Sequence, residues 1–175
     1  TLAMMFAILC GVSAQPEFVD GKKYVIQCAY FNYGGIALGA YHNVNPIVYY
    51  VAAQEVPNDA YWYISMDEQG YYTFRNTQTM EYLVYDPQRV DAQKKGLNLS
   101  ASISGNDAKW KIGILDTGGY YIQSVSHPEQ YFNLRVDGTN LVGTYSGYWS
   151  SNSTFYFLDD KGNMLGGSTD TSVDG

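Results

Sequence analysis

Cysteine, histidine, proline and charge are all scarce in this chain. Its 175 residues include 2 cysteines, 2 histidines and 5 prolines, and only 15% of them are charged. The 10 Lys and Arg are outnumbered by 17 Asp and Glu, which gives a net charge of −7. Nucleic-acid binders usually carry clustered basic residues, but the basic pairs here are only Lys22-Lys23 and Lys94-Lys95. We therefore expect no nucleic acid among its partners.

The one concentrated apolar run lies at the start of the chain. Leu2 to Val12 is followed by Ser13-Ala14 before Gln15, which fits the small-x-small pattern of a secretory cleavage site better than a core helix. We predict that residues 1–14 are a signal peptide without its basic start. The protein is then secreted, periplasmic or on the cell surface. No later run is long enough to predict a membrane span.

Loss of the signal removes Cys10 and leaves Cys28 as the single cysteine, so no disulfide can form within the domain. Such a domain is held by packing, which suits a bacterial exported protein. His42 and His127 belong to no metal-binding pattern, and no nucleophile elbow or phosphate loop is present. We expect no metal, no cofactor and no enzymatic activity, although counting carboxylates leaves a glycosidase pair open.

Tyrosine and glycine are abundant, with 18 of each, and the aromatic residues recur at a fixed period. One column, spaced by 48 residues, consists of Tyr24, Tyr72 and Tyr120. A second column consists of Trp62, Trp110 and Phe155. A fixed period of this size indicates one supersecondary unit made three times. The simplest role for most of these rings is to fill half-buried strand positions.

Short strand candidates, about four in each unit, are separated by turn signals such as Asp86-Pro87 and Asp137-Gly138. The predicted strands are 24–28, 36–41, 48–53, 62–66, 72–76, 82–86, 97–102, 110–115, 120–124, 131–136, 140–145 and 155–159. Three units of four strands predict an all-β fold, a β-trefoil over residues 20–162, because a propeller usually needs at least four blades. The repeats span about 20–67, 68–116 and 117–162. Residues 163–175 are predicted to be a linker, with further domains possible after Gly175.

Within this pattern, Asp59-Ala-Tyr-Trp62-Tyr-Ile64, Gly70-Tyr-Tyr72-Thr-Phe74 and Tyr82-Leu83-Val-Tyr-Asp86 resemble the ricin-type β-trefoil lectin family. The resemblance covers about residues 20–160. That family's Gln-x-Trp motif has lost its Gln in all three units. The corresponding segments are Ala60-Tyr-Trp62, Ala108-Lys-Trp110 and Ser153-Thr-Phe155.

The resemblance implies a shallow sugar site in a repeat. An Asp after the second strand accepts hydrogen bonds from sugar hydroxyls, a ring on or after the third strand stacks on the sugar, and an Asn precedes the fourth-strand aromatic residue. The third repeat matches best, and its predicted ligand-binding residues are Asp137, Tyr145, Tyr148, Trp149 and Asn152.

The other two repeats match less completely. In the second, Asp86 and Asp107 form a weaker predicted site, because the third strand offers Leu99 and Ala101 in place of a ring. In the first, rings are present at Tyr49 and Tyr50, but His42-Asn43 replaces the acid.

The sequence thus predicts a non-catalytic carbohydrate-binding module with a glycan or polysaccharide as partner. The main alternative is a structural or protein-interaction trefoil that has lost sugar binding, with Asp137-Gly138 serving only as a hairpin turn. A protease inhibitor is a third possibility, and it would need a protruding loop, for which residues 87–95 are the candidate.

Overall fold

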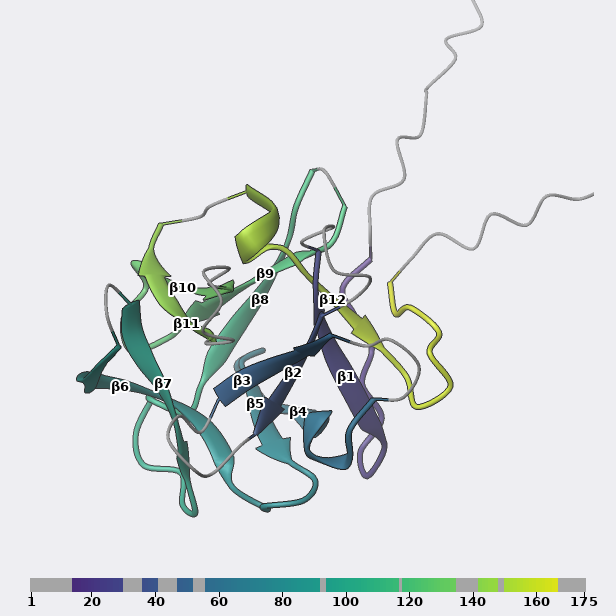
Figure 1. The fold of residues 1–175 in the computed structure, drawn as a ribbon, viewed down its shortest axis with the longest axis horizontal. Coiled ribbons are helices and arrows are strands. Elements are labelled where there is room, and N and C mark those ends of the chain that lie inside the picture. The colour runs from purple at the N-terminus through teal and green to yellow at the C-terminus, as the bar shows by residue number, and fades with distance from the viewer. Residues whose placement is uncertain are drawn as a thin grey trace, which may run out of the picture.

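The structure is a computed structural model that describes residues 14–29, 36–40, 47–51, 56–91, 94–116, 118–134, 142–147 and 150–166. Within these ranges the regular elements are β-strands and two short 3-10 helices (Figure 1). The strands are β1 (Lys23–Cys28), β2 (Ile36–Ala40), β3 (Ile47–Val51), β4 (Tyr61–Met66), β5 (Tyr72–Asn76), β6 (Tyr82–Asp91), β7 (Lys94–Ser100), β8 (Trp110–Ile114), β9 (Tyr120–Ser124), β10 (Gln130–Leu134), β11 (Val142–Ser146) and β12 (Phe155–Leu158). The 3-10 helices are η2 (Asn58–Ala60) and η3 (Ser150–Ser153).

Each predicted strand has its counterpart, and β5 and β9 coincide with their predictions residue for residue. The main difference is β6, which continues to Asp91 where the sequence indicated a turn at Asp86-Pro87. Its ladder with β7 pairs Asp86 with Gly96 and resumes at Val90 with Lys95, so the interruption is a bulge. Proline has no N–H to donate and is tolerated at such a break. The strand therefore does not end at Asp86 as predicted, and residues 87–91 and 94–95 belong to β6 and β7.

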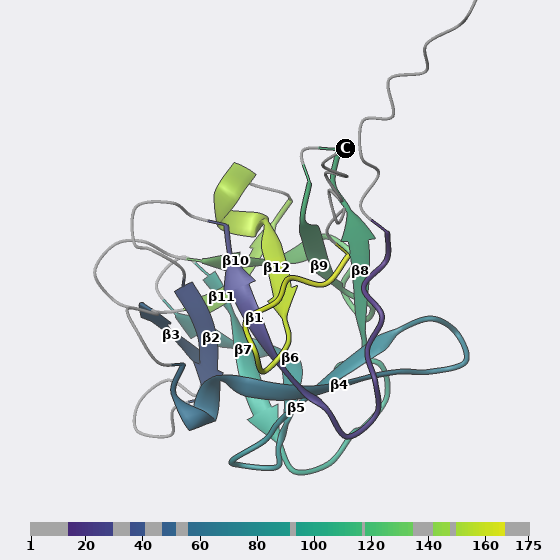
Figure 2. The same cartoon turned by 90° about the vertical axis from the view of Figure 1, so that its right-hand side faces the viewer.

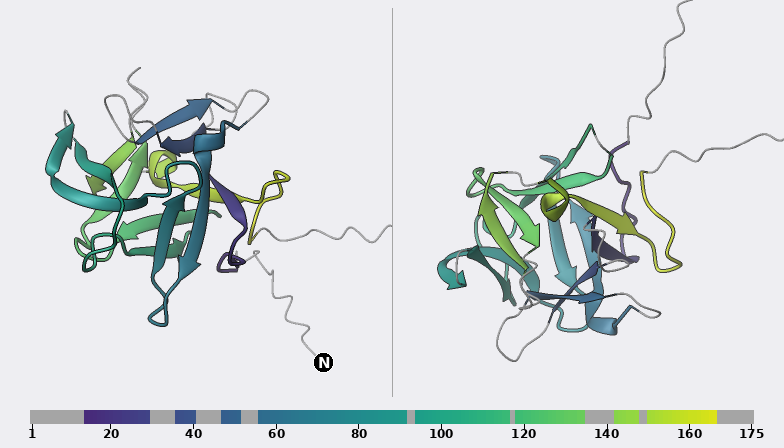
Figure 3. Two further views of the ribbon diagram at one scale, coloured as in Figure 1. Left: turned by 90° about the horizontal axis from the view of Figure 1, so that it is seen from below. Right: turned by 45° about the horizontal axis from the view of Figure 1, so that its top comes forward.

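Six strands close into a ring with threefold regularity. The last strand of each repeat pairs with the first strand of its own repeat and with the first strand of the next. Thus β4 pairs with β1 and β5, β8 with β5 and β9, and β12 with β9 and β1. The hairpins β2–β3, β6–β7 and β10–β11 attach to different sides of this ring (Figure 3). This arrangement confirms the predicted β-trefoil.

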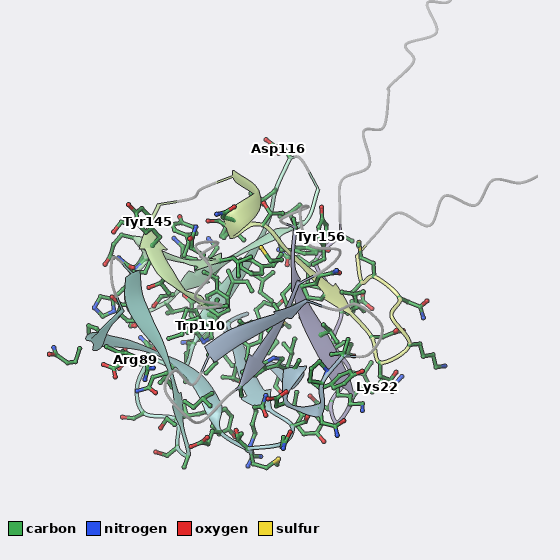
Figure 4. The ribbon with its side chains drawn as sticks, viewed as in Figure 1. Lys22, Arg89, Trp110, Asp116, Tyr145 and Tyr156 are labelled. Atoms are coloured by element: carbon green, nitrogen blue, oxygen red, sulfur yellow. The ribbon has the colours of Figure 1, made fainter. Side chains whose placement is uncertain are left out.

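The two aromatic columns meet in the barrel. The register pairs Tyr24 with Trp62, Tyr72 with Trp110, and Tyr120 with Phe155. All six of these residues are buried, and both tryptophans are fully covered. The Trp62 Nε1–H donates to the Leu38 carbonyl at 2.8 Å, and the Trp110 Nε1–H donates to the Leu83 carbonyl at 3.0 Å. Figure 4 places Trp110 in the interior. The columns are therefore core, as the repeat predicts.

The described ends of the chain lie together at one end of the barrel. Phe18 packs edge-on against Tyr24 and Phe157, with ring centroids 5.0 and 5.1 Å apart. The hydroxyl of Tyr120 donates to the Ala14 carbonyl at 2.6 Å, and the Leu165 amide donates to the Phe157 carbonyl at 2.8 Å. Residues 14–22 run beside β8 in Figure 2. These segments close the barrel at the side away from β6 and β7 (Figure 1).

Candidate functional site

A polar hollow opens at the surface of the second repeat. Its volume is about 330 Å³, and we call it the Asp86–Asp107 hollow. The strands β6 and β7 and the segment before β8 supply its lining, which consists of Val84, Tyr85, Asp86, Pro87, Asn98, Leu99, Ser100, Ser102, Ser104 and Asp107. The bulge in β6 begins at Asp86, so the break in the ladder and the hollow coincide.

Asp86 is held in place by its neighbours. Its Oδ1 accepts a hydrogen bond from the Gln88 amide at 3.0 Å, which closes a local turn across Pro87. Its Oδ2 accepts from the Asn98 Nδ2 of β7 at 3.1 Å. An ionised carboxylate has about four acceptor positions, so Asp86 has capacity left for the hydroxyl of a ligand.

Asp107 reaches the same hollow from the turn before β8. Its backbone carbonyl accepts a hydrogen bond from the Tyr85 amide of β6 at 2.8 Å, which fixes the turn against the strand. The side chain is exposed, and its carboxylate makes no hydrogen bond within the described ranges. The structure thus brings Asp86 and Asp107, the two predicted residues of the second repeat, to one hollow.

Hydroxyls line the rest of the hollow. Ser100 at the end of β7 donates from Oγ to the Ser102 carbonyl at 2.8 Å, which bends the chain. Ser102 and Ser104 follow at alternate positions and line the same wall. Leu99, which stands where the sequence lacks a ring, supplies an apolar surface. The alternation in Ser100-Ala-Ser102-Ile-Ser104 signals these residues, but sequence reasoning considered only Leu99 and Ala101.

Tyr85 contributes to the lining but is only 2% exposed. Its hydroxyl is buried and has no hydrogen-bond partner among the described residues. Burial raises the pKa of this hydroxyl, and the carboxylates of Glu129, Asp107 and Asp86 raise it further. On the far side its ring meets the His127 ring, with centroids 4.4 Å apart.

Of the third-repeat residues, Tyr145 and Asn152 lie within the described ranges, whereas Asp137, Tyr148 and Trp149 lie outside them. Tyr145 is half-buried on β11, opposite Tyr131 of β10 (Figure 4). The Nδ2 of Asn152 donates to the Leu134 carbonyl at 3.2 Å, so this side-chain amide is hydrogen-bonded to the backbone at the end of β10. The third-repeat sugar site remains a prediction.

A second, smaller hollow of about 90 Å³ lies between β1, β4 and β12. Its walls are largely apolar, with Val25, Tyr61 and Leu158 among them. Asp159 at its rim accepts hydrogen bonds from Asn163 and from the Lys161 amide, and its bonds to Asn163 are the main reason why its pKa is lowered. That carboxylate secures a turn, so the Asp86–Asp107 hollow is the better candidate site.

Other chemistry finds little support among the described residues. Ser126 Oγ lies 3.1 Å from His127 Nδ1, but Ser124 Oγ accepts from the His127 amide at 3.1 Å, so the group forms a local turn. In the same ranges no three His, Cys, Asp or Glu residues gather in a way that could hold a metal ion. Nor do these ranges contain a helix long and apolar enough to span a membrane.

No protein-family model and no curated protein matches the chain. Several solved structures do. An endo-β-galactosidase from Clostridium perfringens that releases GlcNAcα1-4Gal has a TM-score of 0.64 and 16% identity over 79% of this chain. A lectin from Polyporus squamosus, solved with a sialylated trisaccharide, has a TM-score of 0.64 and 22% identity over 82% of this chain. The Rhizoctonia solani agglutinin has a TM-score of 0.63 and 14% identity over 83%.

These likenesses show a shared β-trefoil fold. This chain spans 32% of the endo-β-galactosidase and 50% of the Polyporus lectin, but 100% of the Rhizoctonia agglutinin. The trefoil is therefore part of a larger chain in some of these proteins and a complete chain in another.

Proposed function

We propose that this protein is a non-catalytic carbohydrate-binding module of the lectin type that holds a saccharide in the Asp86–Asp107 hollow. The observation that carries the proposal is the convergence of two acidic side chains and a row of serine hydroxyls on one open hollow. The solved lectins with the same fold support this class of function. Because fold alone does not define function, the residues of the hollow are the main support for this proposal.

The hollow has the groups that sugar recognition requires. Asp86 is fixed by Gln88 and Asn98, so it offers acceptors at a defined place for the hydroxyls of a ring. Asp107 adds a second carboxylate to the lining. Leu99 and Pro87 give an apolar surface that suits the C–H face of a sugar. With no exposed ring in the lining, single-site affinity is expected to be low, and retention on a polymer then depends on several sites or copies.

The third repeat is proposed as a second site, in which Asp137, Tyr145, Tyr148, Trp149 and Asn152 bind the sugar. Export is proposed as well, with residues 1–14 as the signal. Both proposals rest on the sequence, and they suit a module that meets glycans outside the cell.

A glycan array tests the function. We expect wild-type protein to bind a defined group of glycans, and Asp107→Ala to weaken that binding about tenfold, which corresponds to the loss of one hydrogen bond to a charged group. Asp116→Ala is the matched control, because Asp116 is an exposed acid in the turn at the opposite end of β8 (Figure 4). The control should bind like wild type.

The array also separates the candidate sites. Asp137→Ala should reduce binding if the third repeat contributes, and Asp107→Ala should do so if the second repeat does. Failure of wild-type protein to bind any glycan would contradict the proposal and favour a structural or protein-interaction trefoil. Incubation with bound oligosaccharides should release no products, since the module is proposed to be non-catalytic.

A further inference from the structure

The two acids in the Asp86–Asp107 hollow accept hydrogen bonds but cannot donate them. The Asn98 amide donates one N–H to Asp86 at 3.1 Å and keeps the other, and the Ser102 and Ser104 hydroxyls add one O–H each. The hydroxyl of Ser100 already donates to the Ser102 carbonyl. The hollow therefore has more acceptors to offer than donors, which favours a ligand that brings its own donors.

The charges of the lining residues also favour a ligand that brings its own donors. Two of the ten lining residues are Asp, and none is Lys, Arg or His. The buried Tyr85 lines the same hollow as Asp86 and Asp107, and the pKa of its hydroxyl is raised by burial first and then by Glu129, Asp107 and Asp86. A carboxylated sugar brought into this field would be repelled, whereas a cation would be attracted.

Asp107 makes this repeat chemically different from the next. It stands three residues before Trp110, and Asn152 stands three residues before Phe155. Asn152 uses its amide to donate to a carbonyl. An acid at the equivalent position cannot donate, and its exposed carboxylate is open to the solvent side of the hollow.

From this arrangement we propose that the Asp86–Asp107 hollow selects a saccharide that carries a protonated amine, an amino sugar without its acetyl group, over neutral and anionic sugars. The proposal rests on the proposed function, since it names the ligand class of the same site. The ammonium group donates up to three hydrogen bonds and pairs with Asp107, while Asp86 accepts from a neighbouring hydroxyl. The volume of about 330 Å³ is at the small end of ligand pockets and suits a short saccharide.

The test compares glucosamine oligomers with N-acetylglucosamine oligomers of the same length by isothermal titration calorimetry. Wild-type protein should bind the deacetylated oligomer up to about fivefold more tightly, the range of an exposed ion pair. Asp107→Asn keeps the size of the side chain but removes the charge, and it should abolish this preference. Asp116→Asn changes the net charge equally, and it should retain the preference.

Salt provides a second measurement on unaltered protein. The preference should persist at about 0.15 M salt and shrink at about 1 M, where the screening length falls to roughly 3 Å. Equal binding of the two oligomers, or tighter binding of the acetylated one, overturns the inference while leaving sugar binding intact. The inference is also overturned if Asp107→Asn still prefers the deacetylated oligomer, or if Asp116→Asn loses that preference. In either case the preference comes from the net charge of the protein and not from Asp107. Absence of binding to every glycan on the array overturns the proposed function and the inference together.

Discussion

Two buried tyrosines illustrate how differently one side chain can be used in this protein. Tyr85 and Tyr120 are 2% and 1% exposed. The hydroxyl of Tyr120 donates to the Ala14 carbonyl at 2.6 Å. The hydroxyl of Tyr85 has no partner among the described residues. A buried polar group without a partner costs about 1–3 kcal/mol, so Tyr85 lowers the stability of the core that its ring helps to fill.

We therefore expect Tyr85→Phe to raise the free energy of unfolding by about 1 kcal/mol, because it removes the unpartnered hydroxyl and keeps the ring. Tyr120→Phe is the matched control, measured in protein that retains Ala14, and it should lower the same free energy by about 1 kcal/mol through loss of its hydrogen bond to the Ala14 carbonyl. Urea titration followed by tryptophan fluorescence measures both. A loss of stability in Tyr85→Phe as large as in Tyr120→Phe would contradict this reading of the core.

Equivalent positions in the three repeats also carry different polar groups. Cys28, Asn76 and Ser124 stand opposite Phe155, Trp62 and Trp110 in the register. Asn76 accepts at Oδ1 from the Gln78 and Thr79 amides, and Ser124 accepts from the His127 amide, so each fastens the turn that follows. The 48-residue period predicts that these positions are equivalent, but not that they secure turns.

Among the strands and turns, the turns that follow the fourth strand of each repeat are nearly identical. Gly70, Gly118 and Gly162 lie at corresponding places with φ of 82°, 83° and 84°. Each glycine amide donates to the carbonyl three residues earlier, which belongs to Asp67, Leu115 and Asp159 respectively. A residue with a Cβ is strained at such a φ, so these glycines are required by the backbone.

Gly118→Ala should lower the free energy of unfolding by about 1–2 kcal/mol. A Cβ at this site would meet no atom within 4 Å, so the whole effect comes from the backbone angle. Gly118→Asn should cost less, since Asn tolerates the left-handed region better. Thermal or urea unfolding of the two variants checks the order. Equal stability of Gly118→Ala and wild-type protein would contradict the assigned conformation.

The hairpin β6–β7 marks the limit of prediction from the sequence. Alternating apolar residues such as Leu83 and Tyr85 predict a strand, and Asp86-Pro87 is typical of a turn. The chain instead keeps pairing to Asp91, because partners on β7 remain available beyond the bulge. Whether a proline ends a strand or sits at a bulge depends on its neighbour in space. The hollow next to this bulge was therefore only partly predictable, through Asp86 and Asp107.

For the domain as a whole, the prediction from the sequence matches the structure wherever the three repeats have the same pattern. The Tyr and Trp/Phe columns predict the core, since burying them requires the same pairing three times. The proposed ligand-binding residues differ between repeats, so the period does not predict them. The serines at 100, 102 and 104 alternate in the sequence, but their position beside Asp86 and Asp107 follows only from the way β6, β7 and the turn before β8 pack together.

Alkaline solution should destabilise the protein. Burial is the main cause that raises the pKa of Tyr72, Tyr85 and Tyr120. In the unfolded chain tyrosine ionises near pH 10. Above that pH the unfolded state releases protons that the folded state still holds, so the free energy of unfolding falls as pH rises.

Urea titrations between about pH 8 and pH 11 test this expectation against the tyrosine pKa of about 10. Stability should be nearly flat below pH 10 and decline above it, and Tyr85→Phe should make the decline shallower because one of the three groups is gone. A stability that stays constant or rises through this range would contradict the assigned burial of the tyrosines.

The meeting of Ala14 with Tyr120, and of Leu165 with Phe157, has a consequence for how the domain can be joined to others. Both ends of the described chain leave from the side of the barrel away from β6 and β7 (Figure 1). A neighbouring domain attached after the C-terminal segment leaves the Asp86–Asp107 hollow facing outward. Because the two ends lie close together, a short linker between them would also permit circular permutation. A domain that follows the trefoil is thus joined on the side of the barrel away from the hollow.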